Sequence, residues 1–187
     1  MSQTAAPPLV DLPLERRQIR KQGGFAFLVC AVFLGGGTLW LPHRLTFPED
    51  FVDRLAFVLR ANFFVLLWLV IAVGIVSTIR RYSAEDNAGS AFSRPSSRLA
   101  IPAAFLQNTL EQVFITTTAF LALATVEGEA PLAYIAASIP LFAVGRITFL
   151  RGYPKGAGGR AFGMATTALP GLGAFIWVFV DMFADLL

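Results

Sequence analysis

The 187-residue sequence predicts an all-α fold, an integral membrane bundle of five spanning helices. Hydrophobic residues make up 56 % of the chain and charged residues only 14 %, whereas a soluble domain usually carries about 25 % charged residues. The apolar residues gather in five runs, each near the ~20 residues that a spanning helix needs. The sequence contains no strand-like alternation of apolar and polar residues and no internal repeat, and its length fits one domain.

Charge and cysteine content narrow the function classes. The net charge is only +3, and the basic residues have a better explanation in membrane topology than in nucleic-acid binding. Cys30 is the single cysteine, so an intramolecular disulfide is impossible. His43 is the single histidine and has no evident partner, and we therefore predict no metal site.

The first segment, residues 1–22, is predicted to be a mobile cytoplasmic tail. It is rich in Pro and Ala and ends with Arg16, Arg17, Arg20 and Lys21. A basic segment before an apolar run is also typical of a signal peptide. We favour a retained helix over 24–41, because the run is long and no small-residue cleavage site follows. Residues 23–56 are then expected to hold an N-terminal membrane helix and an outer loop.

The next segment, residues 57–187, is predicted to hold four more membrane helices. The apolar runs cover 55–79, 99–126, 131–150 and 160–187. Between them lie a polar loop, an acidic turn and a glycine-rich loop, at 80–98, 127–131 and 154–159. Arg60 and Asn62 lie in the first turns of the second run, and we expect both to extend to the nearer membrane interface.

The charges fix an orientation for five spans. Twelve of the fifteen basic residues fall on one side of the alternating topology, in the tail, the 80–98 loop and the region 146–160. The other side keeps Arg44, Arg54 and Arg60 together with most of the acidic residues. The positive-inside rule then places the N-terminus in the cytoplasm and the C-terminus outside. The preference for Arg over Lys and the abundance of Ala and Gly favour a bacterial inner membrane.

A polar hexapeptide, Gln107–Gln112, interrupts the third apolar run. Helical spacing puts Gln107, Asn108 and Glu111 on one face. Polar side chains are costly inside lipid and need partners in the bundle. Two interpretations remain open: hydrogen bonding that only packs helices together, and a binding site.

Other polar residues are expected near this face. Glu111 lies ~15 Å into its helix, and Arg146 lies near the cytoplasmic end of the following helix, so an ion pair between them would neutralise both charges. Tyr153 follows Arg146 by two helical turns, and Arg160 opens the last helix, whose N-terminus favours anions. We predict that Asn108, Glu111, Arg146, Tyr153 and Arg160 line one polar pocket open to the cytoplasm.

These residues resemble the motifs of the MAPEG superfamily, the membrane-associated proteins in eicosanoid and glutathione metabolism. The Asn108-x-x-Glu111 pair, the spacing of Arg146 and Tyr153, and Arg160 at the start of the last helix all match the family pattern, over about residues 57–187. The resemblance implies a four-helix core, to which the N-terminal transmembrane helix is an addition. One departure is Ala104, where catalytic members carry an arginine that helps to hold glutathione.

The resemblance also implies a function. It implies a homotrimer with a site at each protomer boundary, glutathione as co-substrate, and a hydrophobic electrophile that enters from the bilayer. The catalytic residue would be Arg160, which would stabilise the thiolate in a transferase or peroxidase reaction. The residues implied to bind glutathione are Asn108, Glu111, Arg146, Tyr153, Gln107, Arg80 and Arg81.

Two other functions stay open. Ala104 favours a non-catalytic family member with a structural or regulatory role in the membrane. A small channel or transporter is less favoured, because the polar residues concentrate in the cytoplasmic half of the helices. The sequence names neither the hydrophobic substrate nor the thiol.

Overall fold

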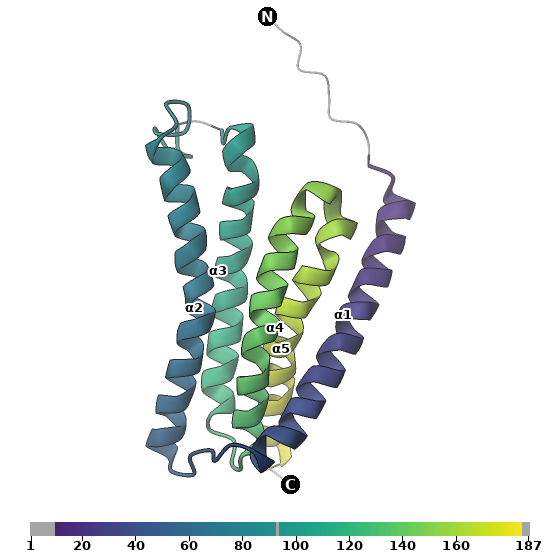
Figure 1. The fold of residues 1–187 in the computed structure, drawn as a ribbon, viewed down its shortest axis with the longest axis vertical. Coiled ribbons are helices and arrows are strands. Elements are labelled where there is room, and N and C mark those ends of the chain that lie inside the picture. The colour runs from purple at the N-terminus through teal and green to yellow at the C-terminus, as the bar shows by residue number, and fades with distance from the viewer. Residues whose placement is uncertain (1–9, 93, 185–187) are drawn as a thin grey trace, which may run out of the picture.

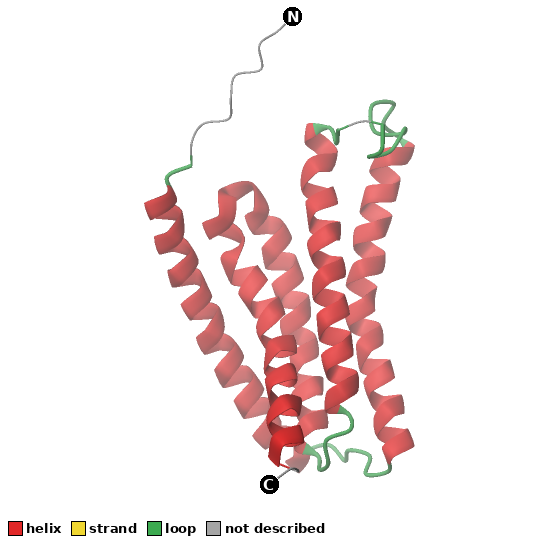
Figure 2. Ribbon diagram, turned by 180° about the vertical axis from the view of Figure 1, so that it is seen from behind, coloured by secondary structure: helices red, strands yellow, loops and turns green. Residues whose placement is uncertain are grey.

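The structure, a computed structural model, describes residues 10–92 and 94–184. Five α-helices stand side by side in this part of the chain (Figure 1). They are α1 (Leu12–Trp40), α2 (Phe51–Arg81), α3 (Ser97–Leu123), α4 (Ala130–Gly152) and α5 (Gly156–Ala184), with 3-10 turns at Leu41–His43 and Tyr153–Lys155. The described residues form helices and loops without a strand (Figure 2), so the all-α prediction is confirmed.

Three helical stretches are long and apolar enough to cross a membrane. They are Leu12–His43, Phe51–Arg81 and Ala130–Ala184, and the last holds both α4 and α5. The helix α3 is not among them, because the polar hexapeptide Gln107–Gln112 lowers its hydropathy. These stretches confirm the prediction that the chain is an integral membrane protein.

The basic segments gather at one end of the bundle. The start of α1, the connection between α2 and α3, and the turn between α4 and α5 all lie at the upper end in Figure 1. The turn between α3 and α4 and the end of α5 lie at the lower end. The helices therefore alternate in direction as the charge pattern predicts.

The N-terminal helix begins earlier than predicted. The Asp11 side chain caps it by accepting a hydrogen bond from the Leu14 N–H at 3.1 Å, and Pro13 occupies the first turn, where a missing N–H costs nothing. The prediction of a mobile tail is therefore wrong from Leu12 to Gln22, which are helical. Residues 1–9 of that tail lie outside the described residues, and Val10 and Asp11 precede the helix without regular structure.

The last helix also begins earlier, at Gly156 rather than Arg160. Gly156 has φ +83°, a backbone conformation that suits glycine, and the chain reverses direction there. A Cβ on Gly152 would collide with the Gly159 carbonyl, so the two arms of the turn touch through glycine. The predicted glycine-rich loop is thus a 3-10 turn followed at once by the first turn of α5.

Two polar residues of α2 lie inside the bundle. Arg54 is 6 % exposed and donates to the carbonyls of Ala124, Val126 and Gly128, where α3 ends and the turn to α4 begins. Asn62 is 3 % exposed and donates to the Thr117 carbonyl at 3.2 Å. The prediction that Asn62 extends to the interface is therefore wrong, because a backbone carbonyl of α3 is within its reach. Arg60, on the other face, is exposed.

Candidate functional site

A buried arginine joins three helices. Arg146 of α4 has no exposed surface. Its Nη1 donates to Asn108 Oδ1 of α3 at 2.8 Å, and its Nε donates to Thr167 Oγ1 of α5 at 3.1 Å. Its Nη2 is buried and has no hydrogen-bond partner among the described residues. A buried donor on a cation is expensive to leave unpaired, so this nitrogen is a candidate donor to a bound ligand.

Close helix packing brings Thr167 to the arginine. At Gly163 of α5, a Cβ would come within 2.6 Å of Phe149 Cα and 2.7 Å of the Gly145 carbonyl, so α4 and α5 touch through backbone at this level. Thr167, one turn further along α5, donates to the Gly163 carbonyl at 2.7 Å. Its hydroxyl oxygen is thereby held in place to accept from Arg146.

Aromatic contacts extend this group toward the start of α5. The Arg146 guanidinium lies 4.9 Å from the centroid of the Phe149 ring, and Phe149 packs edge-on against Tyr153 at 5.6 Å. The Arg160 guanidinium lies 4.3 Å from the centroid of the Tyr153 ring. Asn108, Arg146, Tyr153 and Arg160 therefore belong to one continuous cluster, and the site is open at Arg160, which is partly exposed.

The fifth predicted member, Glu111, points elsewhere. It is exposed, and its Oε1 accepts a hydrogen bond from Gln107 Nε2 at 3.0 Å, one turn before it on α3. The expected ion pair between Glu111 and Arg146 is therefore wrong within one chain. The neutral Asn108 takes the guanidinium instead, because it lies on the face of α3 that turns toward α4 and α5, where its Nδ2 also donates to Met164 Sδ at 3.4 Å.

Arg80 and Arg81 belong to a separate group at the end of α2. Arg81 is exposed, and the Nε of Arg80 is buried without a partner among the described residues. Asp86 holds the two ends of the following loop together, because its carboxylate accepts hydrogen bonds from the Ser96 N–H at 2.9 Å and from the Ser96 hydroxyl at 2.7 Å. These hydrogen bonds, with the nearby charge of Arg80, lower the pKa of the Asp86 carboxyl.

Three residues near the cluster were not predicted from the sequence to belong to the site, and one of them, Met164, was interpreted as a packing residue. Thr167 and Met164 complete the surroundings of Arg146 and Asn108, and Thr167 lies two turns after Arg160, a spacing that would have pointed to it. Glu15 of α1 accepts a hydrogen bond from the Gly158 N–H at 2.5 Å. A carboxylate from the first helix thus already occupies the N-terminus of α5.

The cluster also borders a cavity. Arg160 and Met164 line a pocket of about 310 Å³ between α1 and α5, together with Ile19 and Gly23 of α1 and a row of alanines on α5. Its walls are almost wholly apolar apart from the guanidinium of Arg160. The pocket is thus an apolar cavity with one cationic residue in its lining.

An all-helical fold with apolar spans and a buried cationic cluster defines an integral membrane protein. The chain belongs to the MAPEG family, whose model matches residues 55–180. The match covers α2 to α5 and leaves α1 outside it. No curated protein and no solved structure matches the chain.

Proposed function

We propose that the protein is a thiol-dependent membrane enzyme, a glutathione transferase or peroxidase that acts on hydrophobic electrophiles in the cytoplasmic half of the membrane. The observation that carries this proposal is the cluster from Asn108 to Arg160. It ends in a partly exposed guanidinium that pairs with no carboxylate among the described residues, beside an apolar pocket. A cation of this kind suits an anionic sulfur.

Arg160 has the thiolate-stabilising role in this proposal. A thiol with a pKa of about 8.5 is mostly protonated at neutral pH, and a nearby guanidinium favours the thiolate. The thiol proton leaves to solvent, the sulfur forms its bond to the electrophilic carbon, and the electron pair of the broken bond goes to the leaving group. The free Nη2 of Arg146, with Asn108 and Tyr153, would hold the polar part of the tripeptide by charge-assisted hydrogen bonds.

We further propose that three copies assemble, with a site at each boundary. Glu111 and Gln107 are exposed on α3, within the bundle's length, and a carboxylate facing lipid is costly. A second copy that covers this face would offer Glu111 a partner of opposite charge, which it lacks among the described residues, and would bring Gln107, Arg80 and Arg81 into reach of a ligand bound at the boundary. The exposure of these two polar side chains on α3 supports the proposed homotrimer.

The topology proposed for this assembly has five spans. The family match to residues 55–180 supports a four-helix domain over 57–187, preceded by α1 as an added helix. The gathering of basic residues at one end supports a cytoplasmic N-terminus and an external C-terminus, in a bacterial inner membrane. The 27 residues of α3 are long enough to span despite its polar centre.

The second candidate is a non-catalytic MAPEG protein. Ala104, at the position of the family arginine, favours it, as do the internal partners that already hold Arg146 on two of its three nitrogens. In that function the cluster would serve only to lock α3, α4 and α5 together.

Glutathione titration by calorimetry distinguishes the two. The purified protein in detergent is compared with Arg160→Ala and with a control, Arg151→Ala, which removes an exposed arginine nearby. Saturable binding that weakens in Arg160→Ala but not in Arg151→Ala supports the enzyme. Absence of binding at millimolar glutathione refutes the proposed site and leaves the structural role.

A further inference from the structure

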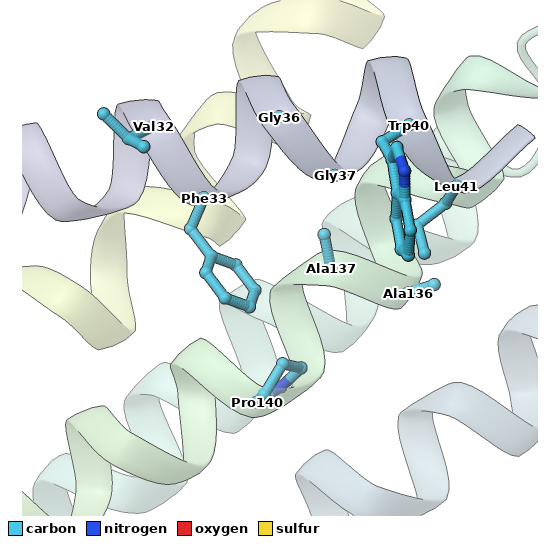
Figure 3. Close-up of a pocket in the computed structure, with 9 residues that line it drawn as sticks. All are labelled: Val32, Phe33, Gly36, Gly37, Trp40, Leu41, Ala136, Ala137 and Pro140. Carbon is cyan, nitrogen blue, oxygen red and sulfur yellow. The ribbon is translucent and has the colours of Figure 1, made fainter. Parts of the chain in front are cut away.

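An apolar groove runs between α1 and α4, away from the Arg146 cluster. It has a volume of about 530 Å³. Its walls are formed by Val32, Phe33, Gly36 and Trp40 on α1 and by Ala136 and Pro140 on α4, without a charged side chain (Figure 3). A surface of this composition accepts hydrocarbon, and it lies within the membrane-spanning stretch Leu12–His43.

Glycine creates the groove. The two helices touch at Gly37, where a Cβ would come within 2.6 Å of the Ala137 Cβ. Gly36, the preceding residue on α1, faces open space, since a Cβ there would meet no atom within 4 Å. Figure 3 shows Phe33 and Trp40 extending from α1 toward α4 on either side of this glycine pair. The missing side chains leave a channel bounded by two aromatic rings.

A cation stands at the end of the groove. The Arg44 guanidinium lies 5.4 Å from the centroid of the Trp40 ring, just beyond the last residue of the spanning stretch. Tryptophan at the end of a span marks the level of the lipid headgroups. Arg44 is exposed and forms no ion pair within the described residues. A phosphate at this level would complement its charge.

We propose that the groove binds one acyl chain of a glycerophospholipid, whose phosphate lies beside Arg44. Packing against an ordered wall gives the chain dispersion contacts, which drive association inside a bilayer. The same end of the bundle carries Glu49, Glu127 and Glu129 around a pocket whose one cation is the buried Arg54, so a headgroup with a net negative charge is disfavoured. The occupant is therefore a zwitterionic phospholipid. This site is independent of the thiol chemistry proposed above.

Quenching of Trp40 fluorescence by brominated lipid tests the proposal. The background variant carries Trp68→Phe and Trp177→Phe, which leaves Trp40 as the single tryptophan. The protein in dodecyl maltoside micelles receives a small, increasing fraction of dibrominated phosphatidylcholine, so that no unlabelled phospholipid competes for the groove. We expect the quenching of Trp40 to saturate at a lower fraction of brominated lipid than random contact with the surrounding molecules would require.

Gly36→Leu fills the groove, and Gly35→Leu is its matched control. A Cβ at either glycine would meet no atom within 4 Å, but only Gly36 lines the groove. Gly36→Leu should abolish the saturable quenching and Gly35→Leu should keep it. Equal quenching in the two variants overturns the proposal. A change of oligomeric mass in Gly36→Leu, with its lipid quenching unchanged, also overturns it and would assign the groove to a contact with a second copy of the chain.

The headgroup is tested with Arg44→Gln. We expect its apparent affinity for brominated phosphatidylcholine to fall about two- to fivefold, the range for an exposed ion pair. Brominated diacylglycerol, which lacks the phosphate, should bind both proteins alike. Stronger quenching by brominated phosphatidylglycerol than by brominated phosphatidylcholine would overturn the choice of a zwitterionic lipid, and an unchanged affinity in Arg44→Gln would overturn the role of the phosphate.

Discussion

Replacing Asn108 by Leu tests whether the Arg146 cluster holds the bundle together. The change keeps the side-chain volume similar and removes the acceptor that lies 2.8 Å from Arg146 Nη1. Because Nη2 already lacks a partner in the described part of the chain, the variant leaves two of the three guanidinium nitrogens unpaired at a site with no exposed surface. A hydrogen bond to a charged group contributes about 1.5 to 3 kcal/mol. For a chain of this length we expect the midpoint of thermal unfolding to fall by about 3 to 12 °C.

The assay is thermal unfolding in detergent, followed by circular dichroism. The control is Gln107→Leu, one residue away, which removes an exposed hydrogen bond to Glu111 and should shift stability by no more than about 0.5 kcal/mol. A second variant, Asn108→Leu with Arg146→Met, removes the buried cation as well and should recover much of the loss, since an apolar replacement of a buried charge is often neutral. Equal midpoints for Asn108→Leu and Gln107→Leu would refute the reasoning, and so would a double variant no more stable than the single one.

Three further predictions concern the rest of the fold. Arg54→Met, which strips three backbone carbonyls of their donor, should destabilise the protein by about 3 kcal/mol or more in the same unfolding assay, at about 1 kcal/mol or more for each carbonyl, whereas the exposed Arg60→Met should not. Gly163→Ala should destabilise by about 1 to 3 kcal/mol because its Cβ meets the backbone of α4, and Gly74→Ala, which meets nothing within 4 Å, should be neutral or stabilising. The pKa of Asp86 is lowered in the folded protein, so the stability that its hydrogen bonds to Ser96 give the 83–96 loop is fully present above the ordinary carboxyl pKa of 3.8 and is lost as pH falls through the lower folded value. Hydrogen exchange of the loop should rise only in that acidic range. Asp86→Asn should remove this pH dependence.

Much of the fold follows from hydropathy and charge, because lipid imposes a minimum length on each apolar run. The five apolar runs correspond to five helices, and the positions of the basic residues predict which helix ends lie together. The errors in the helix bounds lie at Leu12 and Gly156, where caps and glycine turns decide the boundary rather than composition. The membership of Asn108 and Arg146 in one cluster follows from helix spacing, since both are polar residues in apolar helices.

Partners that are backbone atoms leave no trace in the sequence. The charge pattern puts Arg54 in an outer region with other charges, yet its three acceptors are carbonyls far along the chain, and any residue type would supply them. The outward turn of Glu111 has a similar cause: spacing places Gln107, Asn108 and Glu111 on one broad face, but only the packing of α3 against α4 decides which of the three faces inward. The presence of two opposite charges in neighbouring helices is therefore not enough to predict an ion pair, because the packing of the helices decides which side chains meet.

The N-terminus of α5 bears on the proposed chemistry. A helix N-terminus alone favours an anion, and the position of Arg160 in the sequence suggests that both features act on a thiolate together. In the structure, however, Glu15 of α1 takes the Gly158 N–H, and a Cβ on Gly158 would collide with Gln18 of the same helix. The amide end of α5 is thus occupied by a carboxylate from the helix that the family match does not cover. Any stabilisation of a thiolate at this site must then come from the guanidinium of Arg160, which lies beyond the first turn and over the ring of Tyr153. Arg160→Ala is for that reason the decisive variant, because no other cation of the cluster is partly exposed beside the apolar pocket in the described residues.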